Sequence, residues 1–488
     1  MPQPYLRNKI YSIYKPSLGL VRNEPSSILN PRASRVSNNV RYEDGIVKKR
    51  NGYGDYGSGT ITGVPLKFYN YNGTRMLATT TNIYWMDDST WTSIATTIGC
   101  TIDNRITMNT FYDSDTFYCV WGSKNYLAKK WDGTTVTALA TDVSTWKPKV
   151  IVPYQFRLLM FNIDVGGTDK PIRMSYSAAN DISDWTTASV TGSRNLIQGA
   201  GSEILNAVPI NNYLGIYKDR SITLLSYVGG DSIFATQVKV DGIGLMAQDA
   251  IVNLGTKHIF LGNDYNIYQW EGGGELIPIG DKIKWHIKRD IDRSNRGRCF
   301  ATYSNEEREV YFFVPGQNED YATIYYTYNW DNQSWSRNTI TATSGAGEIK
   351  SDDDDELTMI GLSTGGTEWM YSGGNNDDGA AINAYFETPD IIINDEEHIA
   401  QQTDYVGAHI EAIGTTINFE YSLDGGENWS TAETKTLNST TYYDIYDFWF
   451  TKTSRMIRFR FGSTAVDTSW AIRWIELEYK DRERKLWH

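Results

Sequence analysis

The hydrophobic pattern between Asp249 and Ile279 predicts a small antiparallel β-sheet. Four short runs rich in Ile, Val, Phe and Tyr follow one another there: AIVNLG, KHIFLG, NIYQW and ELIPI. They are separated by Thr256, by the pair Asn263–Asp264 and by the glycines Gly272–Gly274. Runs of this length closed by Gly, Asn or Asp are typical of a four-stranded meander. Because one such sheet cannot bury both of its faces, the pattern predicts one copy in a set of sheets packed face to face.

A similar aromatic position recurs along the chain. An aromatic residue that ends an apolar run and is followed by turn residues occurs at Trp85, Trp131, Tyr176, Tyr227, Trp270, Trp330 and Tyr371. Successive positions are 46, 45, 51, 43, 60 and 41 residues apart, and propeller repeats run roughly 40 to 50 residues. The spacing therefore predicts an all-β protein whose residues 57–379 form a β-propeller of six or seven blades. The alternative is a large β-sandwich, because 16 Trp, 33 Tyr and 16 Phe offer such positions by chance.

The two ends of the chain have different patterns. Residues 1–56 contain five prolines, which predict an extended arm, with one hairpin whose turn is Asp44–Gly45. Such an arm cannot form a core alone, so we expect it to bind a neighbouring subunit or an adaptor protein. Residues 380–488 contain longer runs, and apolar and polar residues alternate in Ile417–Tyr421 and Ile457–Phe461. Alternation of this kind predicts a separate β-sandwich with one face of each strand in the core.

Composition excludes several classes of function. The net charge of -13 argues against a nucleic-acid-binding surface, which needs clustered Lys and Arg. Three cysteines without CxxC spacing and five scattered histidines predict neither a disulfide framework nor a metal site. The chain begins without the apolar region of a signal peptide, and no run approaches the roughly 18 apolar residues of a membrane span. We expect a soluble protein with no cofactor, no metal and no membrane anchor.

A set of residues in the first 53 positions carries a family resemblance. They are Gly19, Leu20, Glu24, Pro25, Leu29, Pro31, Asn38–Arg41, Gly45 and Lys49–Tyr53. This arrangement resembles the opening of the tail nozzle proteins of short-tailed bacteriophages, which include the tail tubular B and packaged-DNA-stabilising hub proteins. The C-terminal sandwich is also similar to the module often attached to such phage propellers.

The resemblance implies a structural virion protein without enzymatic activity, forming the hub or nozzle of a phage tail. It further implies a homohexameric ring joined to the portal adaptor and to other tail proteins, with tail fibres as further candidate partners. The ring would retain packaged DNA and give it passage during ejection without binding it specifically. The protein would be made in the host cytoplasm and would reside in the virion.

One motif favours a different class of function. Ser422, Asp424, Gly426 and Trp429 match the Asp-box pattern SxDxGxxW of sialidase propellers. The alternative function is therefore a carbohydrate-binding or glycan-cleaving, sialidase-like β-propeller. The Asp box itself stabilises a hairpin turn through side-chain hydrogen bonds to turn amides. Since it occurs once and no arginine cluster for a sugar acid accompanies it, we predict a structural role and no catalytic residues.

Two charged segments have open interpretations. The acidic residues Asp352, Asp353, Asp354 and Asp355 could chelate calcium, but they lack the spacing of a calcium loop and predict an exposed loop that is a candidate channel or gate loop. The basic segment Lys282–Arg298 predicts a short helix or a long loop between blades. It is either a contact surface for an acidic partner or DNA, or an ordinary solvated helix.

Overall fold

The structure is a computed structural model that describes residues 8–350, 356–363, 368–371, 374–393, 395–396, 399–400 and 402–481. It is 57% strand and 4% helix, which confirms the all-β fold class. The chain divides into two compact units. Unit 1 comprises Met1–Gly54, Tyr326–Thr339 and Ser372–His488, and unit 2 comprises Asp55–Tyr325 and Ile340–Tyr371. The expected division into residues 1–56, 57–379 and 380–488 therefore differs from the structure, since unit 1 is assembled from both ends of the chain.

Unit 2 is a succession of antiparallel meanders. The first three sheets are β6 (Pro65–Tyr71), β7 (Thr74–Thr79), β8 (Asn82–Asp87) and β9 (Thr90–Thr96); β10 (Thr107–Asp113), β11 (Thr116–Ser123), β12 (Tyr126–Trp131) and β13 (Val136–Ala138); and β14 (Trp146–Tyr154), β15 (Arg157–Val165), β16 (Thr168–Tyr176) and β17 (Gly192–Asn195). The next two are β18 (Ile204–Ile210), β19 (Tyr213–Lys218), β20 (Ser221–Gly229) and β21 (Ile233–Asp241); and β22 (Ile251–Asn253), β23 (His258–Leu261), β24 (Ile267–Trp270) and β25 (Ile277–Pro278). The last strands are β26 (Phe300–Ser304), β27 (Glu309–Pro315), β28 (Ala322–Asn329), β29 (Ser334–Lys350), β30 (Glu356–Leu362) and β31 (Glu368–Tyr371). The end of β28 and the start of β29 lie in Tyr326–Thr339 and so belong to unit 1.

The four-stranded meander predicted between Asp249 and Ile279 is confirmed as β22 to β25. The recurring aromatic positions fall at one place in the sheets. Five of them lie in the third strand of their sheet: Trp85 in β8, Trp131 in β12, Tyr176 in β16, Tyr227 in β20 and Trp270 in β24. The sixth, Trp330, directly follows β28. The seventh, Tyr371, is the last residue of β31, the third strand of a sheet that begins with the second part of β29 and continues with β30. The seven positions thus mark seven sheets, because β29 pairs with β28 in its first part and with β30 in its second.

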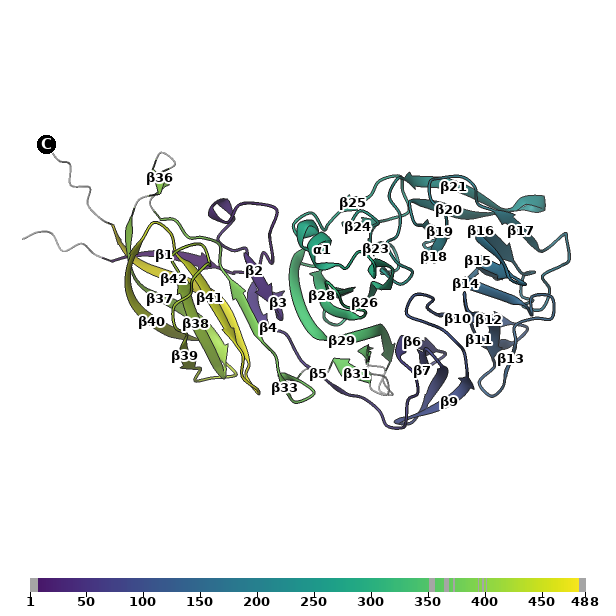
Figure 1. Ribbon diagram of the computed structural model, residues 1–488, viewed down its shortest axis with the longest axis horizontal. Coiled ribbons are helices and arrows are strands. Elements are labelled where there is room, and N and C mark those ends of the chain that lie inside the picture. Colours follow the sequence, from purple (N-terminus) through teal and green to yellow (C-terminus); the bar gives the residue numbers. More distant parts are fainter. Residues whose placement is uncertain are drawn as a thin grey trace, which may run out of the picture. The chain divides into compact units, whose positions relative to one another are not determined.

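One strand from each sheet contacts the next in a closed cycle. These are the first strands β6, β10, β14, β18, β22 and β26, followed by β30, the second strand of the seventh sheet, which contacts β6. In Figure 1 the sheets of unit 2 surround a common centre. A repeated side-chain bond links neighbours, since Thr107 Oγ1 donates to the carbonyl of Lys149 at 2.8 Å and Asn206 Nδ2 donates to that of Gln248 at 2.7 Å. Both bonds span 42 residues, so the sheets repeat in bonding as well as in length.

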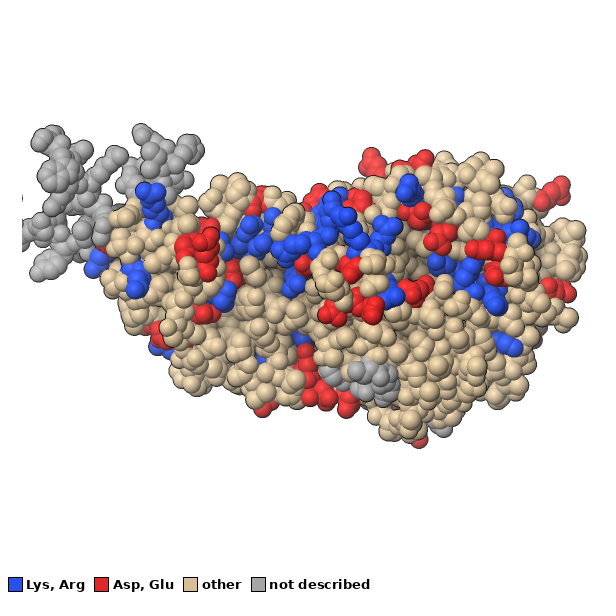
Figure 2. All heavy atoms as spheres, viewed as in Figure 1, with Lys and Arg blue, Asp and Glu red and all other residues tan. Residues whose placement is uncertain are grey.

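The basic segment Lys282–Arg298 forms a short helix, α1 (Lys284–Asp290), as predicted, and a 3-10 turn, η3 (Arg296–Arg298). Some of its cations are paired with acids: Lys284 Nζ lies 2.7 Å from Asp264 Oδ2, and Arg298 Nε lies 2.7 Å from Asp103 Oδ1. Figure 2 shows Lys and Arg interspersed with Asp and Glu over the visible face. These pairs favour the ordinary solvated helix over a nucleic-acid contact. The remaining 3-10 turns are η1 (Ser26–Ile28) and η2 (Gly230–Ser232).

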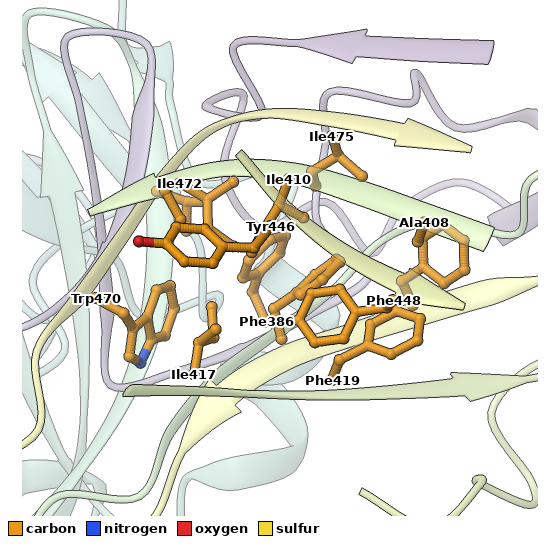
Figure 3. Packing of buried hydrophobic residues seen from close by; sticks show 14 of the residues in the cluster. Phe386, Ala408, Ile410, Ile417, Phe419, Tyr446, Phe448, Trp470, Ile472 and Ile475 are labelled. Atoms are coloured by element: carbon orange, nitrogen blue, oxygen red, sulfur yellow. The ribbon is translucent and has the colours of Figure 1, made fainter. Parts of the chain in front are cut away.

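Unit 1 consists mainly of two sheets that pack face to face. The six-stranded sheet contains β1 (Lys9–Tyr14), β3 (Val40–Glu43), β4 (Ile46–Lys49), β37 (Thr403–Gly414), β40 (Asp444–Ser454) and β42 (Trp470–Asp481). The five-stranded sheet contains β2 (Val36–Asn38), β34 (Ala384–Glu387), β38 (Thr416–Ser422), β39 (Glu433–Thr436) and β41 (Arg458–Ser463). Short strands are β5 (Tyr53–Asp55), β32 (Asn376–Asp377), β33 (Ala380–Ala381), β35 (Asp395–Glu396) and β36 (Ile399–Ala400). Figure 3 shows apolar side chains of both sheets meeting, and the rings of Phe419 and Phe448 stack 4.5 Å apart.

The prediction of an extended arm at the N-terminus was wrong. Strands β1, β3 and β4 belong to the six-stranded sheet, and β2 belongs to the five-stranded sheet. Strand β1 pairs with β42 along its whole length, from Lys9 opposite Tyr479 to Tyr14 opposite Trp474. The prolines do interrupt the segment, but the short runs between them bury Ile13 and other apolar side chains in the sandwich core. The predicted hairpin is confirmed, with Asp44–Gly45 as a two-residue turn, both at positive φ.

The residues that carry the phage resemblance hold this segment in place. A Cβ on Gly19 would lie 2.6 Å from the backbone nitrogen of Trp335, and one on Gly52 would lie 1.8 Å from the carbonyl oxygen of Asn376. The buried Arg50 donates to both carboxylate oxygens of Asp377, at 2.8 and 2.5 Å. The pattern therefore marks close backbone approaches and a buried ion pair within unit 1.

Candidate functional site

The cycle of strands in unit 2 encloses a cavity of about 420 Å³. Residues from β6, β10, β14, β18, β22, β26 and β29 line it. Clefts of this size, where several elements converge and a few polar groups face an otherwise closed wall, are the usual place for a ligand. The cavity is therefore the candidate functional site.

One group of lining residues is an ion cluster. Arg105 is buried, and its Nε donates to Asp249 Oδ2 at 2.6 Å. Its other nitrogens donate to the carbonyls of Ser344 and Leu66 at 2.8 and 2.5 Å. Lys67 Nζ lies 3.7 Å from the second oxygen of Asp249. Burial alone would raise the pKa of Asp249, but Lys67 and Arg105 outweigh it and the pKa is lowered. Asp249 is thus an ionised acceptor.

In a second group of lining residues, the pKa of a carboxyl group is raised rather than lowered. Burial, followed by a hydrogen bond to the neighbouring Glu356 carboxyl, raises the pKa of Glu348 to about 7. Burial and the nearby Glu348 raise the pKa of Tyr303 as well. Glu348 and Tyr303 both line the cavity. At neutral pH the cavity therefore contains a carboxyl group that still holds a proton for part of the time, together with the ionised Asp249.

Amide side chains complete the wall and are fixed by the neighbouring strands. Asn109 Nδ2 donates to the carbonyl of Ile151 at 2.7 Å, and Asn253 Nδ2 donates to that of Pro209 at 3.1 Å. Since each amide bridges two strands, its orientation is set before any ligand enters. Fixed donors and acceptors of this kind suit a ligand with several hydroxyl groups.

The two acids that interact most closely do not have the geometry of a glycosidase pair. Glycosidases separate their two carboxyl groups by roughly 5–5.5 Å or 6.5–9.5 Å so that the glycosidic bond, or a water, fits between them. Glu348 and Glu356 are instead hydrogen-bonded to each other. Such a pair shares a proton and leaves no room for a sugar bond.

The Asp box lies in unit 1, in the turn between β38 and β39. Ser422 Oγ accepts the amide of Gly426 at 2.9 Å and donates to Asp424 Oδ1 at 2.7 Å. Asp424 Oδ1 also accepts the amide of Asn428 at 2.9 Å. The indole of Trp429 donates to the carbonyl of Gly426 at 3.1 Å. All of these bonds stay within the turn, and the structure brings none of these residues to the cavity.

The acidic residues Asp352, Asp353, Asp354 and Asp355 lie outside the described residues. Within the described ranges, no group of three or more His, Cys, Asp or Glu side chains is placed to hold a metal ion. In the same ranges, no helix is long and apolar enough to cross a membrane.

Sequence reasoning missed the cavity residues. Arg105 and Asp249 are 144 residues apart, so no local motif joins them. A usable signal was nevertheless present, because polar residues recur at a spacing of 42 residues, from Thr107 to Lys149 and from Asn206 to Gln248, and Thr107 and Asn206 line the cavity.

Comparison with known proteins adds information on the fold. The family model for Reelin subrepeat B matches residues 378–488, which is less than half of the chain. No curated protein matches the sequence.

Several solved structures are similar in part. PorZ, an essential surface component of the type-IX secretion system of Porphyromonas gingivalis, has 10% identity, a TM-score of 0.36 and coverage of 69% of this chain and 42% of its own. The extracellular domain of a two-component system of B. thetaiotaomicron has 9% identity, a TM-score of 0.42 and coverage of 73% and 42%. An exo-β-1,3-galactanase from Phanerochaete chrysosporium has 10% identity, a TM-score of 0.28 and coverage of 88% and 100%. The chain thus spans less than half of the first two proteins.

Proposed function

We propose that this protein is a β-propeller that binds carbohydrate in the central cavity of unit 2. The observation that carries the proposal is the cavity itself, with a partly protonated Glu348, an ionised Asp249 and the cation Lys67 on one wall. A sugar hydroxyl is both donor and acceptor, so it can bond to all three kinds of group.

The propeller assignment is supported by the repetition of the sheets. Seven meanders follow one another among the described residues, and one strand from each contacts the next in a closed cycle. A sheet of this size is stable only when both faces are covered, and neighbours in a propeller provide that cover. Large-sandwich packing would require two sheets rather than a cycle.

We further propose that binding occurs without hydrolysis. The acid with the raised pKa is bonded to Glu356 rather than facing a second carboxylate across a gap. Asp249 is held by Arg105 and Lys67, and this pairing weakens it as a base.

A glycan array followed by calorimetric titration of the best-bound glycan tests the proposal. Lys67→Met and Glu348→Gln are expected to weaken binding about tenfold each, because each removes a polar contact worth about 1.4 kcal/mol. Lys288→Ala, on the exposed side of α1, is the matched control and should bind like the wild type. The proposal would be refuted if the protein bound no glycan, or if the Lys67 and Glu348 variants bound as tightly as the wild type. Released reducing sugar would show that the protein is a hydrolase.

A second candidate is a structural subunit of a bacteriophage tail hub or nozzle. The observation that favours it is that the residues of the phage resemblance, such as Gly19, Arg50 and Gly52, are the ones that fasten the N-terminal segment to unit 1. A homohexamer, with passage of DNA and contacts to the portal adaptor, belongs to this candidate. Native mass spectrometry and negative-stain images of the purified chain test it: a six-membered ring supports it, and a monomer at micromolar concentration argues against it.

A further inference from the structure

A groove of about 550 Å³ lies on unit 1, at the outer face of the six-stranded sheet. Aromatic side chains from three parts of the chain line it: Tyr14 at the end of β1, Trp474 in β42 and Tyr443 just before β40. Glu411 of β37 and Arg473 of β42 add charge to the same groove. No part of it belongs to unit 2, so the groove is distinct from the cavity.

Strand pairing puts the aromatic rings side by side. Tyr14 lies opposite Trp474, and Trp474 lies opposite Glu411. The rings of Tyr14 and Trp474 are 5.9 Å apart with planes inclined by only 13°. Tyr14 is 62% exposed. The two rings are therefore stacked, and the pair offers aromatic surface to solvent.

A bulge in β42 brings two consecutive side chains to this face. Glu411 pairs with Trp474 and Ala412 pairs with Ile472, so Arg473 is an extra residue in the ladder. Ile472 and Ile475 on either side are buried in the core. Regular alternation would turn Arg473 or Trp474 inward, whereas the bulge turns both outward. Bulges are common next to binding sites because they re-aim side chains in this way.

Two charged groups of the groove, Arg473 and Glu411, are paired with each other. Arg473 Nε donates to Glu411 Oε2 at 2.7 Å, and Arg473 Nη2 donates to the other oxygen. The guanidinium group also lies 4.4 Å from the centre of the Tyr443 ring. With Lys15 and Asp44, which also line the groove, the formal charges cancel. The groove is therefore polar but has no net charge.

We propose that this groove binds a short neutral oligosaccharide. A pyranose ring has an apolar C–H face that packs on aromatic rings and a rim of hydroxyls that bond to fixed donors and acceptors. The groove does not favour an anionic ligand, because Arg473 is engaged by Glu411 and the charge of Lys15 is offset by that of Asp44. A peptide strand would need an open sheet edge, and the groove lies on a face. A lipid chain would cover the ion pair of Arg473 and Glu411 without offering it any polar group.

Affinity electrophoresis in native gels tests the proposal with the full chain. Four neutral polysaccharides serve as probes: laminarin, hydroxyethylcellulose, arabinoxylan and galactan. All groove substitutions are introduced into a background chain that already carries the cavity substitutions Lys67→Met and Glu348→Gln. Retardation of this background then reports binding in the groove alone. At least one probe is expected to retard this background. Tyr14→Ala and Trp474→Ala should each weaken retardation about tenfold, because each removes an aromatic contact.

Two further variants keep the test decisive. Tyr14→Phe retains the ring and should bind like the background, while Trp449→Ala removes an equally exposed aromatic residue, 60% exposed, from outside the groove and should change nothing. Tyr14 is exposed, so Tyr14→Ala gives a folded protein even if Trp474→Ala does not. The groove proposal fails if no probe retards the background, or if Tyr14→Ala is retarded as strongly as Tyr14→Phe. In either case cavity binding, measured on the chain with Lys67 and Glu348 intact, is unaffected.

Discussion

The Asp424 carboxylate accepts hydrogen bonds from the backbone and then the side chain of Asn428, and from Ser422, and these bonds lower its pKa to about 2. Its pKa in an unfolded chain is about 3.9. A lowered pKa contributes stability above the unfolded value, and this contribution is lost as the pH falls through the folded value. At the scale of single residues, the turn therefore responds to acid, although none of its residues lines the cavity or the groove.

We predict that Asp424→Asn lowers the thermal midpoint slightly and by the same amount at every pH above about 4. The difference from the wild type should disappear as the pH approaches 2, because the wild-type carboxylate is then protonated. Thermal unfolding from pH 2 to 7 measures this. Glu427→Gln removes a neighbouring charge from the same turn and should not reproduce the effect.

Glu348 should have the opposite dependence. Its folded pKa of about 7 lies above the value for an unfolded chain, so its contribution to stability is complete at pH 4 and is lost as the pH rises through 7. We predict that the wild-type thermal midpoint falls between pH 5 and 8 and that Glu348→Gln, which imitates the protonated form, flattens this fall. A wild-type midpoint that is constant over the same range would contradict the assigned direction.

Residue-scale prediction from the sequence succeeded where a motif is contiguous. The Asp box spans eight residues, and its bonds stay inside that span. The cavity residues could not be found in this way, since the acidic character of Glu348 depends on burial and on Glu356, and Asp249 depends on Arg105. Burial and partners of this kind are properties of the folded chain.

At the scale of elements, β1 shows how a short strand is held. Its two isoleucines face opposite sides of the sheet: Ile13 is 2% exposed, and Ile10 is 58% exposed. Ile13 lies in the core shared by the two sheets of unit 1. The strand is therefore part of the sandwich of its own chain.

We predict that Ile13→Ala destabilises unit 1 by about 2–5 kcal/mol, because it leaves a cavity in the core. The matched change Ile10→Ala should stay within about 0.5 kcal/mol of the wild type, since it alters only an exposed position. Urea unfolding followed by tryptophan fluorescence measures both. Equal effects of the two substitutions would show that β1 does not pack as described.

Elements joined by short turns were predictable, and elements joined across the chain were not. The β3–β4 hairpin and the β22–β25 meander each pair neighbours in sequence, so turn residues and apolar runs were sufficient. Strand β1 pairs with β42 at the other end of the chain. The prolines near β1 indicated an arm because nothing nearby could reveal a partner.

At the scale of the whole molecule, charge sets the expected behaviour toward DNA. The chain has 46 Lys and Arg against 59 Asp and Glu, which gives -13. We predict that the full chain does not retard duplex DNA in a gel shift at micromolar concentration and about 0.15 M salt, where screening acts over about 8 Å. Binding that weakens steeply with added salt would instead indicate a concentrated basic surface.

The pairing of β1 with β42 also has a consequence for how the protein is made. Ser12 Oγ donates to Glu476, 464 residues further along the chain. A ribosome that adds roughly 5–20 residues per second delivers these two strands roughly 20 to 90 s apart. All of unit 2 emerges in that interval and can pair its neighbouring strands. The side chains of Ile13, Val40 and Val47 remain exposed until the last strand is synthesised. The nascent chain therefore offers its first apolar strands to chaperones for most of its synthesis, and the sandwich closes last.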